Sequence, residues 1–194
     1  MQPNEIRQHF RQLRRALSES QQWQHGQQIV DRIEEVLGNS NNKRIAAYLA
    51  TQGELSLDAW MQSNTRHRIY LPKLYESVTP QLRFAPLCEN TTWCYNRFGI
   101  AEPDHHWGET LHARQLDIIL MPLVAFDRHG RRMGMGGGYY DRSLSFRKHR
   151  QHWLSPKLIG IAHSCQQHDG LPENPWDIRP DMIITEKEII VAKN

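Results

Sequence analysis

Residues 117–144, DIILMPLVAFDRHGRRMGMGGGYYDRSL, decide the fold, because they join a buried-strand pattern to a glycine-rich loop and then to a helical stretch. The run DIILMPLVAF (117–126) is apolar almost throughout, as in a strand that is covered on both faces of a parallel sheet. The glycine loop follows, and a helix is predicted from about Tyr139 to Lys148. Strand, loop and helix in this order predict one unit of an α/β protein.

Two helices are predicted before the first strand. Apolar residues recur at intervals of three and four at Ile6, Phe10, Leu13 and Leu17. The other face of this first helix carries Arg7, Arg11, Arg14 and Arg15. Ser18 has the character of an N-cap, and Gly38 that of the stop of a second helix. The helical portion therefore covers about residues 4–37.

The alternation continues to the end of the chain. Strands are predicted at RIAAYLA (44–50), RIYLP (68–72), LRFAPL (82–87), KLIGIAH (157–163) and DMIIT (181–185), with a short capped helix from Ser56. Residues 89–111 have no clean period, so we expect a long, partly ordered loop. We predict a single α/β domain over residues 1–194, with an open, mostly parallel sheet flanked by helices at about 43–192.

Composition narrows the class of protein. The 24 basic and 21 acidic residues contain no run of five or six like charges, so the charge pattern does not require a nucleic-acid partner, and we expect none. No apolar stretch has the length of a signal peptide or a membrane span, which predicts a cytoplasmic protein without a membrane partner. The three cysteines lack C-x-x-C spacing, so we expect neither a disulfide scaffold nor a structural zinc site.

The glycine loop is the candidate site. Five glycines stand between positions 130 and 138, and a loop this rich in glycine after a strand can turn its N–H groups toward phosphate oxygens. Arg131, Arg132 and Arg142 add positive charge, and Asp141 is a candidate ligand of a divalent cation. The alternative is a purely structural turn. No Lys-Ser or Lys-Thr follows the glycines, and the G-x-G-x-x-G spacing fails at Tyr139, so neither common nucleotide motif applies.

The segment 117–144 resembles the signature of the 5-formyltetrahydrofolate cyclo-ligase family. The likeness continues through AYLATQGEL (47–55), IYLPK (69–73), RFGIAEP (97–103) and LPENPWDIRPDMIIT (171–185). It implies a fold like the NagB/RpiA/CoA-transferase group. It also implies an ATP-dependent enzyme that uses Mg²⁺ and converts 5-formyltetrahydrofolate, with or without a polyglutamate tail, to 5,10-methenyltetrahydrofolate with release of ADP and phosphate. The formyl oxygen is phosphorylated in that reaction, and N10 then closes the ring.

The resemblance also implies site residues. The catalytic residues would be Arg132 and Tyr140. The ATP-binding residues would be Arg7, Arg132, Met133, Gly134, Met135, Gly136, Gly137, Gly138, Tyr139 and Tyr140. The folate-binding residues would be Leu49, Glu54, Phe98, Met135, Gly136, Gly137, Gly138 and Tyr139. The magnesium ligands would be Asp141 and Asp177.

Several of these residues have a structural alternative. Asp177 also fits an ordinary turn acid, Glu54 a solvated surface carboxylate, Phe98 a core residue, and Arg7 one of four solvated arginines on a helix face. Two departures from the family pattern concern charge. Pro3 stands where many members have Lys, and Met135 and Gly137 stand where some members have basic residues in the loop.

Two other functions remain open from the sequence. The first is a phosphate- or CoA-ester-binding relative of the same fold without folate chemistry. The second is an RNA-associated protein that uses the arginine face of the first helix, which requires several bases on one surface. We expect a monomer.

Overall fold

The computed structural model describes residues 2–75, 78–149 and 155–192. Its centre is a seven-stranded sheet in the order β11-β10-β9-β6-β1-β2-β3. The strands are β1 (Arg44–Ala46), β2 (Arg68–Tyr75), β3 (Gln81–Pro86), β6 (Ile118–Pro122), β9 (Lys157–Ile161), β10 (Met182–Ile184) and β11 (Ile189–Val191). The five from β10 to β2 run parallel, and β11 and β3 are antiparallel edges. The predicted open, mostly parallel sheet is confirmed.

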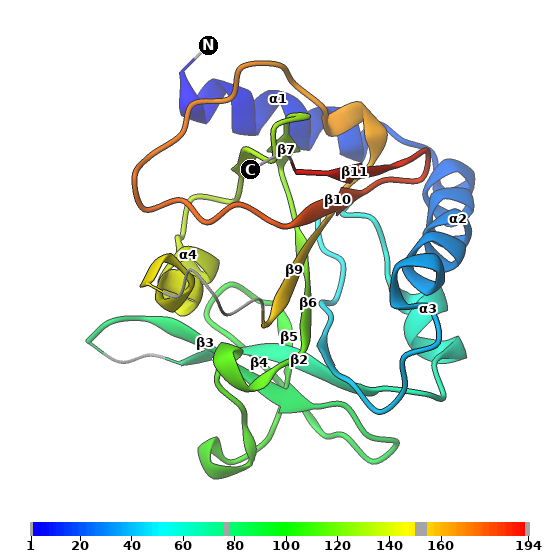
Figure 1. The fold of residues 1–194 in the computed structure, drawn as a ribbon, viewed down its shortest axis with the longest axis vertical. Helices are drawn as coiled ribbons and strands as arrows, with labels where there is room; N and C mark the ends of the chain where they lie inside the picture. The colour runs from blue at the N-terminus through cyan, green and yellow to red at the C-terminus, as the bar shows by residue number, and fades with distance from the viewer. Residues whose placement is uncertain (1, 76–77, 150–154, 193–194) are drawn as a thin grey trace.

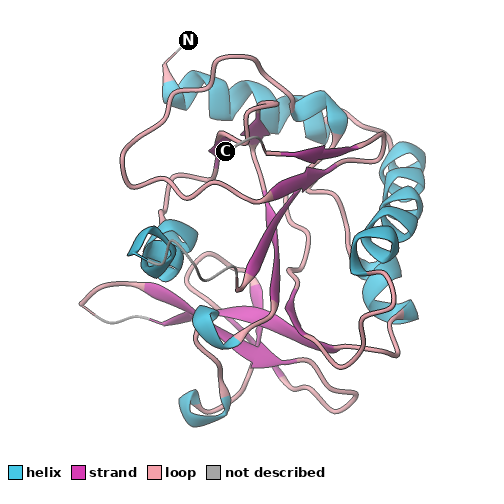
Figure 2. Ribbon diagram, in the orientation of Figure 1, coloured by secondary structure: helices cyan, strands magenta, loops and turns pink. Residues whose placement is uncertain are grey.

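Helices cover both faces of the sheet (Figures 1 and 2). The helix α2 (Glu19–Leu37) and the short α3 (Asp58–Ser63) pack on one face, where Ile33 and Trp60 are fully buried. The helix α4 (Tyr139–Leu144) packs on the other face through Leu144, beside β3 residue Phe84. Short 3-10 turns are η1 (Trp107–Glu109), η2 (Ala113–Gln115), η3 (Ser145–His149) and η4 (Ser164–Gln166).

The first helix, α1 (Pro3–Arg15), lies across the carboxyl ends of the parallel strands (Figure 1). Its residues Ile6 and Phe10 are buried with Val124, which follows β6, in a separate small core. The predicted stripe is only partly right, because Leu13 is exposed and Arg14 is fully buried. The buried positions therefore follow an interval of four, and one arginine of the predicted solvent face lies in the interior.

Residues 89–111 are more ordered than predicted. They contain a hairpin of β4 (Trp93–Tyr95) and β5 (Ala101–Pro103). The buried carboxylate of Glu102 accepts hydrogen bonds from the backbone N–H of Leu74 at 3.0 Å and from Asn96 Nδ2 at 2.7 Å. These bonds anchor the hairpin to β2. No local sequence pattern predicts them.

The run 117–126 is not one strand. It divides after Pro122, and its second half, β7 (Ala125–Phe126), pairs with β8 (Arg132–Met133) in a second small hairpin. The helix predicted to Lys148 changes to 3-10 geometry after Leu144. In the part of the chain that the structure describes, no helix is long and apolar enough to cross a membrane.

Candidate active site at the glycine loop

The glycine loop joins β8 to α4 and depends on residues without a side chain. Gly136 and Gly138 have φ values of 99° and 63°, in the left-handed region that other L-residues rarely adopt. A Cβ atom on Gly138 would lie 2.8 Å from Arg142 Nη1. Arg142 itself holds the loop, since it donates to the carbonyls of Gly137 at 2.7 Å and Pro80 at 2.6 Å.

Arg7 reaches this loop from α1. Its Nε donates to the carbonyl of Gly134 at 3.0 Å, and Nη1 donates to Asn4 Oδ1 at 2.9 Å. Arg7 also lies 3.6 Å from the position that a Cβ atom would take on Gly136. The alternative of a merely solvated arginine is therefore wrong, and a guanidinium group lies directly beside the glycines.

Arg132 and Asp141 form an ion pair behind the loop. Arg132 is buried, its Nη2 contacts Asp141 Oδ1, and its Nε donates to the carbonyl of Ile178 at 2.7 Å. The N–H of Ile178 donates back to Asp141 Oδ1 at 3.2 Å. Burial raises the pKa of the partly buried Tyr140, the nearby Glu54 raises it further, and Arg132 opposes both. These effects favour the protonated form of Tyr140, which can donate a hydrogen bond.

Glu54 lies inside the protein, in the turn that follows β1. One carboxylate oxygen is 3.4 Å from Arg14 Nη2, and the other accepts from Thr51 N at 3.1 Å. Desolvation raises the pKa of Glu54, while the charge of Arg14 opposes the rise. Desolvation likewise lowers the pKa of Arg14. The solvated alternative for Glu54 is wrong.

Arg14 links the Glu54 turn to the glycine loop. Its Nη2 lies 4.0 Å from the sulfur of Met135, whose side chain is 47% exposed. Its other nitrogens donate to the carbonyls of Gln52 at 3.0 Å and Leu123 at 3.3 Å. This one side chain therefore connects the segments that follow β1 and β6 with the loop.

An aromatic pair borders the loop on its open side. Phe98, in the turn between β4 and β5, is 58% exposed and packs edge-on to Tyr139 with 6.3 Å between ring centroids. Arg97 bonds the Tyr139 hydroxyl, and its guanidinium lies 4.9 Å from the Phe98 ring centroid. The alternative that Phe98 is a core residue is therefore wrong. The tip of the hairpin instead presents an exposed ring next to the first residue of α4.

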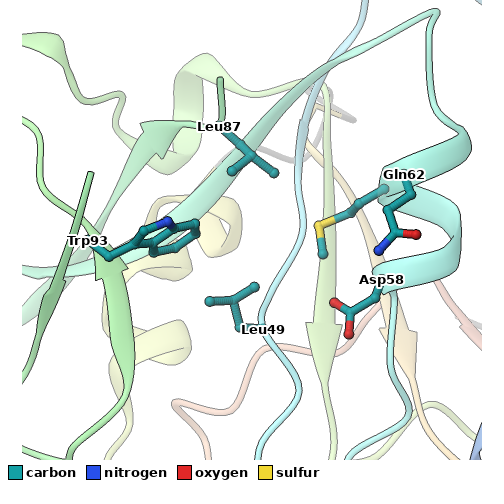
Figure 3. A pocket seen from close by; sticks show the side chains of 6 residues that line it. Leu49, Asp58, Gln62, Leu87 and Trp93 are labelled. Atoms are coloured by element: carbon teal, nitrogen blue, oxygen red, sulfur yellow. The ribbon is translucent and has the colours of Figure 1, made fainter. Parts of the chain in front are cut away.

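Leu49 lines a pocket of about 190 Å³ between α3 and the β4–β5 hairpin. Trp93 of β4 faces Leu49 and Leu87 across this pocket, and Asp58 and Gln62 of α3 border its other side (Figure 3). Mostly apolar walls with a few polar groups are typical of small-molecule sites.

Three predicted contributions differ from the structure in detail. The side chain of Met133 lies in the small core with Ile6 and Phe10, so only its backbone is near the loop. Asp177 accepts from Asn174 N at 2.8 Å and Asn174 Nδ2 at 3.2 Å, as a turn-stabilising acid does. Arg131 pairs with Asp127 at 2.6 Å, so its charge is matched within its own turn.

Sequence reasoning missed Arg14 and Trp93. The signal for Arg14 is its position four residues after Phe10 and eight after Ile6, both buried. Trp93 gives no such signal, because its short strand is recognisable only from its pairing with β5.

Comparisons with known proteins identify the family. Residues 2–186 match the model of the 5-formyltetrahydrofolate cyclo-ligase family. The chain is 36% identical to the 5-formyltetrahydrofolate cyclo-ligase of Haemophilus influenzae, with 90% of this chain and 92% of the relative aligned. It is 35% identical to that of Escherichia coli K12, over 93% and 98% of the two chains.

Solved structures agree as well. The 5,10-methenyltetrahydrofolate synthetase of Aquifex aeolicus superposes with a TM-score of 0.81 at 26% identity, covering 100% of this chain and 94% of the other. The synthetase of Mycoplasma pneumoniae gives a TM-score of 0.73 at 28% identity, over 96% and 99% of the two chains. Sequence and fold lead to the same conclusion: this chain is an enzyme that belongs to the 5-formyltetrahydrofolate cyclo-ligase family.

Proposed function

We propose that this protein converts 5-formyltetrahydrofolate to 5,10-methenyltetrahydrofolate at the cost of one ATP, releasing ADP and phosphate. The observation that carries the proposal is the meeting of three segments at the glycine loop: Arg7 on α1, the buried Glu54 turn, and the Phe98 tip of the hairpin. An anion site and an aromatic, carboxylate-bearing site are thereby adjacent, as a reaction between ATP and a folate requires.

The loop and its arginine suit the phosphates of ATP. Gly134, Gly136, Gly137 and Gly138 have no side chains to cover their backbone N–H groups, and Arg7 supplies positive charge beside Gly136. Phosphoryl transfer needs positioning and charge neutralisation more than a protein nucleophile. In the proposed reaction the formyl oxygen attacks the γ-phosphorus and ADP leaves. N10 then attacks the formyl carbon and loses its proton, and phosphate leaves as the ring closes.

The turn, the pocket and the hairpin tip suit the folate. Glu54 offers carboxylate oxygens to the N–H edge of a pterin ring, and the Phe98 ring offers a stacking surface. The pocket lined by Leu49 and Trp93 offers further apolar walls. Tyr140, held neutral, can donate a hydrogen bond to a phosphate or formyl oxygen.

Asp141 is the best candidate to hold Mg²⁺. Arg132 and the N–H of Ile178 both bond its Oδ1. Its second carboxylate oxygen is a hard ligand, which suits an ion that takes most of its other ligands from phosphates and water. Asp177 stands next to Ile178 and would need to release Asn174 to join it. Bound Mg²⁺ would neutralise phosphate charge.

The test follows the absorbance of the methenyl product when purified protein is mixed with 5-formyltetrahydrofolate and Mg-ATP, omitting each component in turn. Glu54→Gln and Asp141→Asn should each lower kcat/KM at least about tenfold, equivalent to about 1.4 kcal/mol. Arg128→Ala, an exposed arginine at the β7–β8 turn, should leave it unchanged. ATP binding without any folate-dependent turnover would replace this proposal with a phosphate- or CoA-ester-binding relative.

A further inference from the structure

A second cluster of titratable side chains also lies at the carboxyl ends of the parallel strands, outside the glycine loop. It joins His25 of α2, His163 just after β9 and Glu186 just after β10. One ligand atom from each residue lies within 4.8 Å of the others. The two Nδ1 atoms of the histidines are 2.8 Å apart, and His25 Nε2 is 4.0 Å from Glu186 Oε1.

The two histidines face each other through their Nδ1 atoms. His163 is fully buried, and its Nε2 has no hydrogen-bond partner among the residues that the structure describes. In a bond between the two Nδ1 atoms one ring must donate a proton and the other must accept it. A metal cation between the two rings would replace that proton and accept one lone pair from each Nδ1 atom. The Nε2 of His163 would then carry the remaining ring proton.

The carboxylate is prepared for the same role. Glu186 is buried and accepts hydrogen bonds from the Ser164 amide at 2.8 Å and from the Ser164 hydroxyl. The group is therefore an oriented acceptor, with its outer contacts in place as in established metal sites.

The separations suit a first-row metal ion. Two nitrogens about 2.1 Å from a metal, at angles between octahedral and tetrahedral values, are roughly 3.0–3.4 Å apart. The observed Nδ1 separation of 2.8 Å is close to this range. A Glu186 carboxylate oxygen lies 4.0 Å from His25 Nε2, and the ligand atoms of the three residues all lie within 4.8 Å of one another.

We propose that His25, His163 and Glu186 bind a divalent transition-metal ion such as Zn²⁺, with water completing the coordination. Two imidazoles and one carboxylate are a recurrent ligand set for such ions, whereas Mg²⁺ favours oxygen ligands alone. The ion ties α2 to the ends of β9 and β10 behind the turn that carries Gly53 and Glu54. Cysteine spacing gave no indication of zinc because this site uses no thiol.

The direct test is calorimetric titration of tag-free, chelator-stripped protein with ZnCl₂, without ATP or folate. One Zn²⁺ should bind per chain, and His25→Ala and Glu186→Gln should each weaken binding at least about tenfold. The control His129→Ala removes an exposed histidine and should bind like the wild type. Unaltered affinity in both cluster variants, or no stoichiometric binding by the wild type, would overturn the proposal.

A second readout separates ligation from a change in folding. Co²⁺ bound at this site should give visible ligand-field absorption with the wild type and lose it with Glu186→Gln, while circular dichroism confirms that the variant is folded. Zn²⁺ should raise Tm of the wild type and not of His25→Ala. An equal rise with Mg²⁺ would contradict the assignment to a transition metal.

Discussion

Replacing Arg14 with Met should destabilise the protein by about 3–5 kcal/mol, the usual cost of removing one partner of a buried ion pair. Met has a similar length, so little cavity forms. The variant loses the bonds from Arg14 to the carbonyls of Gln52 and Leu123, and it leaves the Glu54 carboxylate buried without an opposing charge. Urea unfolding followed by circular dichroism measures the loss, and Arg15→Met, an exposed arginine one position on, should cost less than about 0.5 kcal/mol.

A double-mutant cycle isolates the charge pair. Glu54→Gln removes the carboxylate but keeps an acceptor for Thr51, so the double variant should recover part of the loss of Arg14→Met. The coupling between the two substitutions should be about 1.5–3 kcal/mol. If the two single effects add to within about 0.5 kcal/mol, the pair is not coupled, and Arg14 acts only through its bonds to carbonyl groups.

The same pair predicts a pH dependence. In the wild type, desolvation holds the pKa of Glu54 above its value of 4.5 in the unfolded chain, and Arg14 limits the rise. In Arg14→Met that limit is gone, so the folded pKa rises further. A carboxyl group with a raised folded pKa costs no stability below its unfolded pKa and costs its full amount above its folded pKa. The defect of Arg14→Met should therefore be largest at neutral pH and shrink as the pH falls toward the unfolded pKa.

Two further substitutions test the loop and the pocket. Gly138→Ala should lower the free energy of unfolding by about 1–2 kcal/mol and lower turnover, because the φ of 63° suits glycine and the new Cβ atom would contact Arg142. The control Gly108→Ala has open space at its Cβ position and should change neither stability nor turnover. Wild-type unfolding of Gly138→Ala would contradict the observed loop. Trp93→Ala should raise KM for 5-formyltetrahydrofolate at least about tenfold, equivalent to about 1.4 kcal/mol, with little change in Tm, and Trp23→Ala, also exposed, should leave KM unchanged.

Local signals in the sequence predicted much of the fold correctly. Ser18 does cap α2, accepting from Gln21 N at 3.2 Å, and Gly38 ends that helix with φ of 54°. The buried runs at β6 and β9 are strands, and the glycine loop lies where open α/β sheets bind ligands. Each of these features is encoded within a few residues, so a pattern is enough to find it.

The features that escaped prediction depend on partners distant in sequence. Arg14 is buried because Glu54, forty residues later, lies opposite it. The β4–β5 hairpin is fixed by Glu102 reaching Leu74, and no periodicity reports that bond. The histidines of the second cluster are 138 residues apart, so the sequence shows how many histidines there are but not which of them are neighbours.

The helix α1 has a role that neither its charge nor its apolar stripe suggests. Arg7 and Arg14 are seven residues apart and so lie on the same face, with Phe10 buried between them. The first touches the glycine loop at Gly134, and the second touches Met135 and the Glu54 turn. Since the packing of Phe10 fixes the position of both guanidinium groups, one short helix sets the spacing between the proposed phosphate and folate sites. Arg14 therefore contributes to stability and to alignment through the same set of bonds.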